Sequence, residues 1–373
     1  MRRVVITDAT TITAPGNNLS ELWQGLLAGE TAIRPVNRFP LDNYGSKIAA
    51  CIEDLKPING HSMIHALLDR LFFEMGPVPP DSFLITATTK AGIDNLETLR
   101  RGNSADFQDV LLSSITDIVS QKLGLVGSGI NVSASCASST IAIALGAEMI
   151  ASGRTEATLI CCADLVTEFI FSGFSALKAL SPVPCMPFDR GRNGLSLGDG
   201  AAALLLMSHS RAKRENRERL GTILGSGITN DATHITAPSK SGRGLIHAIV
   251  QALKKAGRKP DEIGAINAHG TGTVYNDIME LNAFKRVFGK RKVPVYSVKG
   301  VIGHTLGAAG GIEVILGLKT LSTRIVPPTV GFSDPEDGAK GLVSSEPQQI
   351  SGGCLLTTNS GFGGVNAALV LGR

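Results

Sequence analysis

Similar sequence segments occur in the two halves of this chain, and this internal repeat restricts the possible folds more than any other feature of the sequence. Residues 198–206 (GDGAAALLL) and 363–371 (GGVNAALVL) both place an apolar strand pattern directly after glycines. Residues 146–150 (GAEMI) and 311–315 (GIEVI) match each other in the same way, inside two helical patterns. Strand and helix patterns alternate along the chain, which is typical of α/β folds. We therefore expect two similar βα units, packed as a pseudo-dimer with a site between them.

A charge run at residues 211–219 (RAKRENRER) separates the two units. Its mixed signs favour a solvated connector over a binding patch. We divide the chain into residues 1–210 and 211–373. In the first unit we expect strands at 3–7, 83–86, 157–162 and 200–207, and helices at 19–28, 61–75, 106–122 and from Cys136 to Gly153. In the second we expect strands at 220–228, 263–267, 293–298, 354–358 and 365–371, and helices at 242–257, 277–288 and 305–321.

Composition excludes several classes of protein. With 373 residues, 43% of them hydrophobic and 18% charged, the chain is globular and well buried rather than disordered. A net charge of +4 is too weak to indicate nucleic-acid binding, although it suits an acidic protein partner. The six cysteines show no C-x-x-C spacing, so we expect a reduced protein without a structural zinc site. No apolar run is long enough for a signal peptide or a membrane span, which predicts a cytoplasmic location.

The candidate nucleophile is Cys136, in residues 131–140 (NVSASCASST). A short strand pattern breaks there into small residues before a helical pattern begins. A thiol at this turn would lie beside the unpaired N–H groups of the helix start, which favour the thiolate form. A buried structural cysteine is the commoner outcome for a single residue of this type. This stretch alone leaves both interpretations open.

Three glycine-rich segments of the second half add polar groups at strand ends. They are residues 267–273 (NAHGTGT), 297–310 (SVKGVIGHTLGAAG) and 358–366 (TNSGFGGVN). α/β proteins build their sites at such strand ends. Each segment alone could be a structural turn. A phosphate-binding loop is the other alternative, but none of the segments reads G-x-x-x-x-G-K-[ST]. Together with Cys136, they predict a catalytic site.

These segments resemble the β-ketoacyl-acyl carrier protein synthases, the elongating condensing enzymes of the thiolase superfamily. The resemblance covers essentially the whole chain and includes residues 179–181 (ALS), 187–189 (PFD) and 198–201 (GDGA). It implies a five-layered αβαβα thiolase fold and a dimer. It also implies an acyltransferase that condenses malonyl thioester, with loss of CO₂, onto an acyl group held on Cys136. No cofactor is implied beyond the phosphopantetheine of an acyl carrier protein, and no metal site.

The resemblance also implies roles for individual residues. Cys136 attacks the acyl thioester, and its backbone N–H forms the oxyanion hole with that of Phe362. His269 and His304 donate hydrogen bonds to the developing enolate. Lys299 and Glu313 form a pair that orients His304. Substrate contacts are expected from Thr271, Thr273 and Gly363 on the pantetheine side, with Phe362 as the gate between the acyl and malonyl steps, and structural roles from Asp277 and Glu280.

The chain departs from the family pattern around the gate and the cap rather than at the reacting residues. Asp8, Asn193, Leu195 and Gly300 replace usual residues, and the region from about 45 to 85 is shortened. Fatty-acid synthesis and a specialised polyketide, polyene or lipid pathway therefore both stay open. A non-catalytic, chain-length-determining partner subunit is the alternative function, although such subunits typically lack the cysteine. Thiolases carry a second catalytic cysteine, whereas Cys354 lies in an apolar strand, and initiating synthases have Asn in place of His304.

The expected partner is an acidic acyl carrier protein, and the sequence leaves two alternatives open for the dimer, a second copy of this chain or a related subunit. Candidate docking cations are Arg190, Arg192, Arg211, Lys213 and Arg214.

Overall fold

The computed structural model describes residues 2–350 and 352–373. Within these ranges a ten-stranded mixed sheet runs through the molecule in the order β11-β10-β14-β15-β9-β1-β8-β6-β4-β5. Its first half-sheet contains β1 (Val4–Thr13), β4 (Phe83–Ala87), β5 (Ile130–Val132), β6 (Ala157–Asp164) and β8 (Gly200–Ser208). Its second half-sheet contains β9 (Gly221–Asn230), β10 (Ile263–Asn267), β11 (Val295–Tyr296), β14 (Cys354–Gly361) and β15 (Val365–Gly372).

The two half-sheets have the same topology. The first is ordered β1-β8-β6-β4-β5 and the second β9-β15-β14-β10-β11. If the strands of each half are counted along the chain, both half-sheets have the spatial order 1-5-4-2-3. The directions of pairing also match: β4 is parallel to β5 and β6, as β10 is to β11 and β14. The half-sheets join where residues 4–6 of β1 pair with residues 221–223 of β9. The internal repeat of the sequence thus corresponds to two half-sheets of the same topology.

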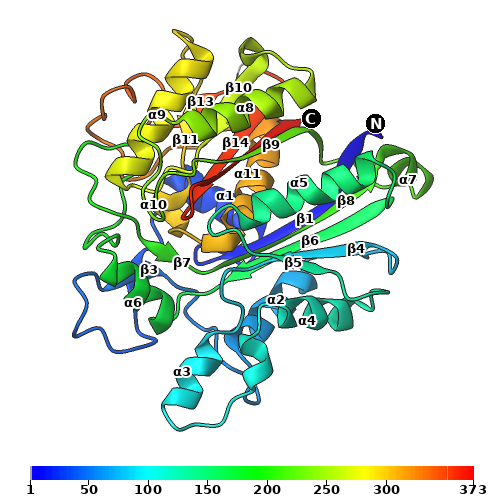
Figure 1. Cartoon of the computed structure of the whole chain (residues 1–373), viewed down its shortest axis with the longest axis vertical. Coiled ribbons are helices and arrows are strands. Elements are labelled where there is room, and N and C mark those ends of the chain that lie inside the picture. Colours follow the sequence, from blue (N-terminus) through cyan, green and yellow to red (C-terminus); the bar gives the residue numbers. More distant parts are fainter. Residues whose placement is uncertain (1, 351) are drawn as a thin grey trace.

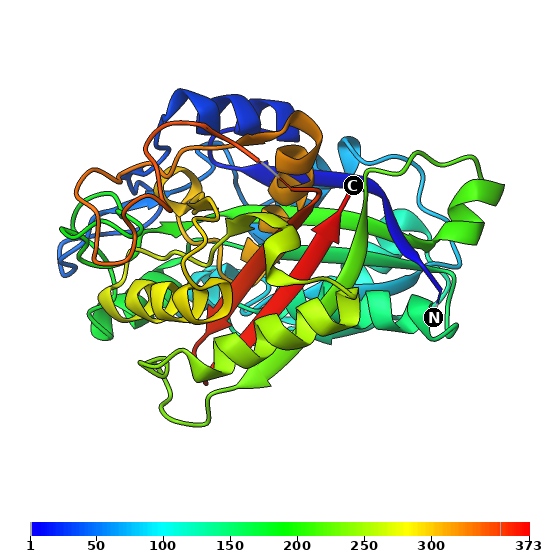
Figure 2. The same ribbon diagram turned by 90° about the horizontal axis from the view of Figure 1, so that it is seen from above.

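Helices form three layers around the half-sheets (Figure 1). The inner pair, α5 (Ser138–Ala151) and α11 (Ala309–Thr323), contact each other and both half-sheets. The first half-sheet is covered outside by α2 (Met63–Phe73) and α4 (Ser114–Leu123). The second is covered by α8 (Arg243–Ala256) and α9 (Val274–Phe288), beneath which β14 and β15 run side by side in Figure 2. This αβαβα layering is the thiolase-like fold.

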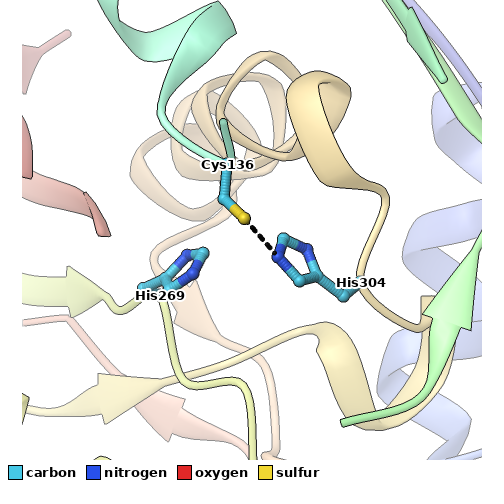
Figure 3. Close-up of side chains that lie close together, drawn as sticks. All are labelled: Cys136, His269 and His304. Atoms are coloured by element: carbon cyan, nitrogen blue, oxygen red, sulfur yellow. Dashed lines mark hydrogen bonds between the residues drawn. The ribbon is translucent and has the colours of Figure 1, made fainter. Parts of the chain in front are cut away.

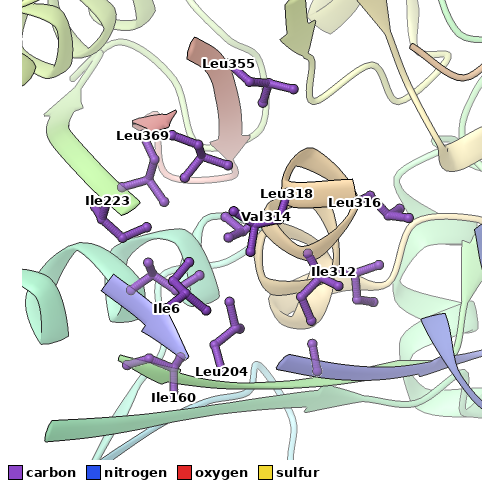
Figure 4. Packing of buried hydrophobic residues seen from close by; sticks show 14 of the residues in the cluster. Ile6, Ile160, Leu204, Ile223, Ile312, Val314, Leu316, Leu318, Leu355 and Leu369 are labelled. Carbon is purple, nitrogen blue, oxygen red and sulfur yellow. The ribbon is translucent and has the colours of Figure 1, made fainter. Parts of the chain in front are cut away.

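The inner layer makes the largest core of the molecule. Val314 and Leu318 of α11 lie between Leu204 of β8 and Leu369 of β15 (Figure 4), and all four are buried. Helix α11 approaches α5 closely because it lacks side chains at the contact: a Cβ at Gly310 would overlap Thr140. Because apolar residues surround α11 on all sides, its sequence lacks the polar face of a surface helix.

Shorter elements complete the chain. Helices α1 (Leu19–Ala28), α3 (Asp94–Arg100), α6 (Glu168–Ala176), α7 (His209–Arg214) and α10 (Lys299–Ile302) and the 3₁₀ turns η1 (Phe107–Val110), η2 (Pro260–Glu262) and η3 (Leu306–Ala308) lie in the connections. A small sheet contains β2 (Arg34–Pro35), β3 (Ile48–Ala50) and β7 (Leu197–Gly198), and β12 (Ile325–Val326) pairs with β13 (Gln348–Gln349). None of the described helices is long and apolar enough to cross a membrane.

Two predicted elements have both of their predicted ends. Helix α1 begins after Asn18, whose side chain accepts from the Glu21 N–H, and ends at Gly29 with φ 71°. Strand β10 also spans the predicted residues.

Other predicted elements differ. Strand β1 continues to Thr13, beyond the predicted end at residue 7, because β8 pairs along its whole length. The predicted helix 106–122 is a 3₁₀ turn followed by α4, and the predicted helix 305–321 is η3 followed by α11. The charge run begins within α7, so the division at residue 210 falls inside a helix and stays a prediction.

Candidate active site

Cys136 lies on a tight turn between β5 and α5. The preceding Ser135 has a left-handed backbone (φ 50°), which is strained for a residue with a side chain. Hydrogen bonds hold the turn: Ser138 Oγ accepts from the Ala134 N–H and donates to the Ser135 carbonyl. The Ser135 hydroxyl donates to the carbonyl of Phe362 at 3.0 Å. The nucleophile turn of the first half is therefore fixed against a loop of the second half.

Two histidines of the second half face the thiol (Figure 3). His304 Nε2 lies 3.0 Å from Cys136 Sγ, and the ring centroids of His269 and His304 are 5.1 Å apart. His269 follows the end of β10, and His304 follows α10 after Gly303, whose φ of 66° suits glycine. The structure thus brings together the three residues that the sequence placed at separate strand ends.

The hydrogen bonds of the rings define where their protons lie. The Leu306 N–H donates to Nδ1 of His304, so Nε2 of the neutral ring carries the proton and points it at the sulfur. Nδ1 of His269 faces the Asn359 amide nitrogen at 3.2 Å and Lys299 Nζ at 3.4 Å, which are both donors. The proton of His269 therefore also lies on Nε2. Both imidazoles offer an N–H group to the reacting centre.

Both histidines are held in the neutral form. Burial lowers the pKa of His269 and of His304 well below the ordinary value, and the charge of Lys299 lowers both further. At neutral pH each ring is therefore a neutral hydrogen-bond donor rather than an imidazolium.

Lys299 and Glu313 form a buried ion pair beside His269. Lys299 Nζ lies 2.5 Å from Glu313 Oε1 and donates to the His269 carbonyl, and both side chains are 1% exposed. Asn359 donates to the other carboxylate oxygen at 2.7 Å. Burial raises the pKa of Glu313, and the charge of Lys299 opposes that shift. The expectation that this pair orients His304 is wrong: it contacts His269, while His304 is held by the Leu306 N–H.

Burial disfavours the thiolate form of Cys136, which opposes the effect expected from the helix start. Burial raises the pKa of the Cys136 thiol to about 12. The charge of Lys299 and a hydrogen bond from the backbone N–H of Phe362 lower it, but burial outweighs both. Two donors, the Phe362 N–H and His304 Nε2, are therefore available to stabilise sulfur once it becomes anionic.

Cys136, His269 and His304 open into a cavity of about 440 Å³. Thr271 and Thr273 line it, as expected, and their hydroxyls lie 2.9 Å apart. Gly363 does not line it; the neighbouring Gly361 and Gly364 do.

The Phe362 ring stacks on Phe174 at the cavity wall, with ring centroids 5.7 Å apart. Sequence reasoning missed Phe174, Lys178, His234 and Tyr275, which also line the cavity. They lie in loops or at helix ends, without a pattern that distinguishes them from other surface residues.

Asp277 and Glu280 hold the backbone around the site. Glu280 accepts from the N–H groups of His269 and Gly270, and burial raises its pKa to about 7. Asp277 accepts from the N–H of Phe188. Their positions fit the structural role expected of them.

The candidate docking cations do not share one surface. Arg192 is only 1% exposed and pairs with Glu336, so it is not a docking residue. Arg211 and Arg214 lie on α7, which follows the end of β8 far from the cavity; β8 starts beside Thr305 and its nine residues span about 25–30 Å. Arg190 is exposed and precedes the cavity residue Asn193 by three positions. Lys178, on the cavity rim, is a further exposed cation.

Comparisons with known proteins identify the family of the chain. The family models described as "Beta-ketoacyl synthase, N-terminal domain" and "Beta-ketoacyl synthase, C-terminal domain" match residues 84–212 and 220–333. The chain is 32% identical to a 3-oxoacyl-[acyl-carrier-protein] synthase 2 of Vibrio harveyi, over 99% of this chain and 98% of that protein. It is 30% identical to the tetracenomycin polyketide synthase ketoacyl synthase alpha subunit of Streptomyces glaucescens, over 100% of this chain and 97% of that protein.

A solved structure titled the ishigamide ketosynthase/chain length factor superposes with a TM-score of 0.90 at 27% identity, covering 100% of this chain and 99% of the other. With both family models matched in order and relatives similar over their full length, this chain belongs to the β-ketoacyl synthase family.

Proposed function

We propose that this protein is a 3-oxoacyl-[acyl carrier protein] synthase that uses Cys136 as its nucleophile. The observation that carries the proposal is the arrangement of the Cys136 thiol, 3.0 Å from His304 Nε2, with His269 beside it and both rings offering N–H groups. A structural cysteine requires neither two neutral histidines nor a cavity. The relatives' names and the family membership support the same chemistry.

In the first step, the sulfur of Cys136 attacks the carbonyl carbon of an acyl thioester. A new S–C bond forms, the bond to the carrier thiol breaks, and the thiol proton leaves with the carrier sulfur. The backbone N–H groups of Cys136 and Phe362 stabilise the oxyanion in between. The exchange of one thioester for another is nearly balanced in energy. A protonated resting thiol limits reaction with other electrophiles, because the thiolate is the reactive form.

In the second step, a malonyl thioester loses CO₂ and the electron pair of the broken C–C bond forms an enolate. His269 and His304 donate their Nε2–H groups to the thioester oxygen as its charge develops. Neutral imidazoles suit this role because they keep their protons while stabilising the charge. The enolate carbon then attacks the acyl group on Cys136, and the product is a 3-oxoacyl thioester on the carrier. The thiolate of Cys136 that leaves takes up one proton from water, because the decarboxylative condensation consumes one proton overall.

The surrounding residues position these groups. Lys299, Glu313 and Asn359 fix the ring of His269. Thr271 and Thr273 receive the pantetheine arm inside the cavity. Phe362 links the nucleophile turn to the cavity wall through Ser135 and Phe174, which suits a gate that responds to an acyl group on Cys136.

The proposed partners are an acyl carrier protein and a second subunit of the same fold. The solved ketosynthase/chain length factor supports a heterodimer, and an identical second copy is the other possibility. The substrates arrive on phosphopantetheine in the cytoplasm, and the chemistry needs no further cofactor. Relatives of nearly equal identity are named as a 3-oxoacyl-[acyl-carrier-protein] synthase 2 and as a polyketide synthase subunit, so the acyl chain that the cavity accepts decides the pathway.

The test is the intact mass of the protein after incubation with acyl carrier protein thioesters of graded chain length. Wild type should gain one acyl group and Cys136→Ala none, with one chain length preferred. The acylated wild type should then release CO₂ from malonyl carrier protein and yield a 3-oxoacyl product. An adduct at another residue would refute the proposal, as would a lack of adduct from every donor even after co-expression with a companion subunit.

A further inference from the structure

A second cluster of histidine and carboxylate side chains lies outside the active site, in the cap formed by residues 58–110. It contains His61, His65 and Asp109, whose ligand atoms all lie within 4.8 Å of one another. His65 is on α2, and Asp109 is on η1. The cluster has no part in the proposed condensation, so the inference drawn from it does not depend on that proposal.

The spacing of these atoms is close to that of metal ligands. A tetrahedral zinc site with bonds of about 2.0–2.1 Å places its ligand atoms about 3.3–3.4 Å apart. His61 Nδ1 lies 3.4 Å from Asp109 Oδ2 and 3.6 Å from Asp106 Oδ2. His65 Nε2 lies 2.8 Å from Asp109 Oδ1, a hydrogen-bond distance that opens by about half an ångström when a metal ion replaces the proton.

One of these atoms lacks a partner. His61 Nδ1 is buried but has no hydrogen-bond partner among the residues that the structure describes, although two carboxylates face it. A histidine that served only to pair with Asp109 would be expected to donate to it, as His65 does. A cation bound between His61 Nδ1 and the facing carboxylate oxygens would give the unpaired nitrogen a partner and would neutralise the carboxylates.

The turns and hydrogen bonds around the cluster hold its side chains in position before any metal ion binds. Asn59 and Gly60 take left-handed conformations (φ 53° and 80°) in the turn that presents His61. Asn95 donates to the carbonyl of Gly60 and to Asp109 Oδ2, so it ties the two ligand-bearing loops together. Asp109 Oδ2 also accepts from the Ser62 N–H. Such contacts to the ligands are the supporting shell that metal sites require.

The geometry points to a divalent transition-metal site formed by His61, His65 and Asp109. Two imidazole nitrogens and one carboxylate suit Zn²⁺ and its neighbours and disfavour Mg²⁺, which prefers oxygen ligands. A bound ion would clamp the start of α2 to the η1 loop and so stiffen the cap.

The test is metal titration of the Cys136→Ala protein, which removes the thiol of the other cluster that could hold an ion, Cys136 with His269 and His304. Zn²⁺ is measured by competition with a chromophoric chelator, and Co²⁺ by its visible absorption bands. We expect one ion per chain, at least tenfold weaker binding in His61→Ala and His65→Ala, and no binding of Mg²⁺. His247→Ala, an exposed helical histidine outside both clusters, should bind like the parent.

We expect His61→Ala to remain folded, because this half-exposed side chain makes no hydrogen bond through Nδ1. Weaker metal binding by this variant would therefore report the loss of a ligand and not unfolding. Metal should also raise the melting temperature of the parent and not that of His61→Ala. Absence of saturable Zn²⁺ binding in the parent would overturn the inference. So would binding that His61→Ala and His65→Ala leave unchanged while both variants remain folded.

Discussion

Replacing only Lys299 of the buried pair with Glu313 should lower the free energy of unfolding more than removing both charges together. Both side chains are 1% exposed, and the charged atoms are 2.5 Å apart. At an effective dielectric constant of about 20, that separation corresponds to roughly 6–7 kcal/mol of attraction, which desolvation of both ions partly offsets. Lys299→Met leaves the Glu313 carboxylate without its counter-charge. We expect this variant to lose about 3–5 kcal/mol of unfolding free energy.

The comparison that isolates the pair is a double-mutant cycle. Lys299→Met/Glu313→Gln removes both charges and keeps an acceptor for Asn359, so it should be more stable than Lys299→Met alone. The matched control is the surface pair of Lys122 and Asp69, whose side chains are 26% and 57% exposed. Breaking that pair should cost less than about 1 kcal/mol.

Chemical denaturation and the melting temperature give the readout. For a chain of 373 residues, 3–5 kcal/mol corresponds to a fall of about 4–6 °C in melting temperature. A cost below about 1 kcal/mol for Lys299→Met, or additive effects of the two substitutions, would refute the assignment of a tightly coupled buried pair.

Three further predictions concern the chemistry and the partner. First, His269→Ala should slow CO₂ release from malonyl carrier protein by about 10²–10³-fold while acyl transfer to Cys136 persists, since an oxyanion donor is lost; equal loss in both steps would contradict the division of roles. Second, because burial raises the pKa of Cys136 to about 12, its alkylation by iodoacetamide should accelerate about tenfold per pH unit between pH 7 and 10, and a plateau near pH 8 would show a thiolate at rest. The same raised pKa means that the contribution of this thiol to stability is complete at neutral pH and is lost only as the pH rises toward 12. Third, Arg190→Glu and Lys178→Glu should raise the KM for carrier-bound substrate several-fold with kcat unchanged, whereas Arg211→Glu on distant α7 should leave KM unaltered; the reverse pattern would move the docking surface to α7.

Much of this fold follows from local signals in the sequence. The cap at Asn18 and the stop at Gly29 define α1, and the glycine-started apolar runs define β8 and β15. The length of β1 could not be predicted, because its pairing with β8 depends on residues about 190 positions away. The split of helix 305–321 likewise reflects the left-handed Leu306 (φ 52°), which no local residue signal marks.

The reacting residues were predictable from the sequence, but their contacts were not. Cys136, His269 and His304 occur in distinct glycine-rich segments, so their types and order carried the information. That Lys299 supports His269 rather than His304 depends on how Lys299 lies relative to the loop after β10, which spacing does not define. The buried state of Arg192 was hidden for the same reason, since a charged residue in a loop is normally exposed.

The position of α11 bears on how the chain can be made. The helix comes from the last quarter of the sequence, yet it packs against both half-sheets and against α5. Until it is synthesised, the parts of the first half-sheet and of α5 that pack against α11 have no cover, and such apolar surfaces aggregate. The histidines at 269 and 304 also emerge late, so a nascent chain carries Cys136 without its two donors. Translation therefore completes the core and the reactive centre together, and a chain truncated before residue 309 should be both insoluble and inert.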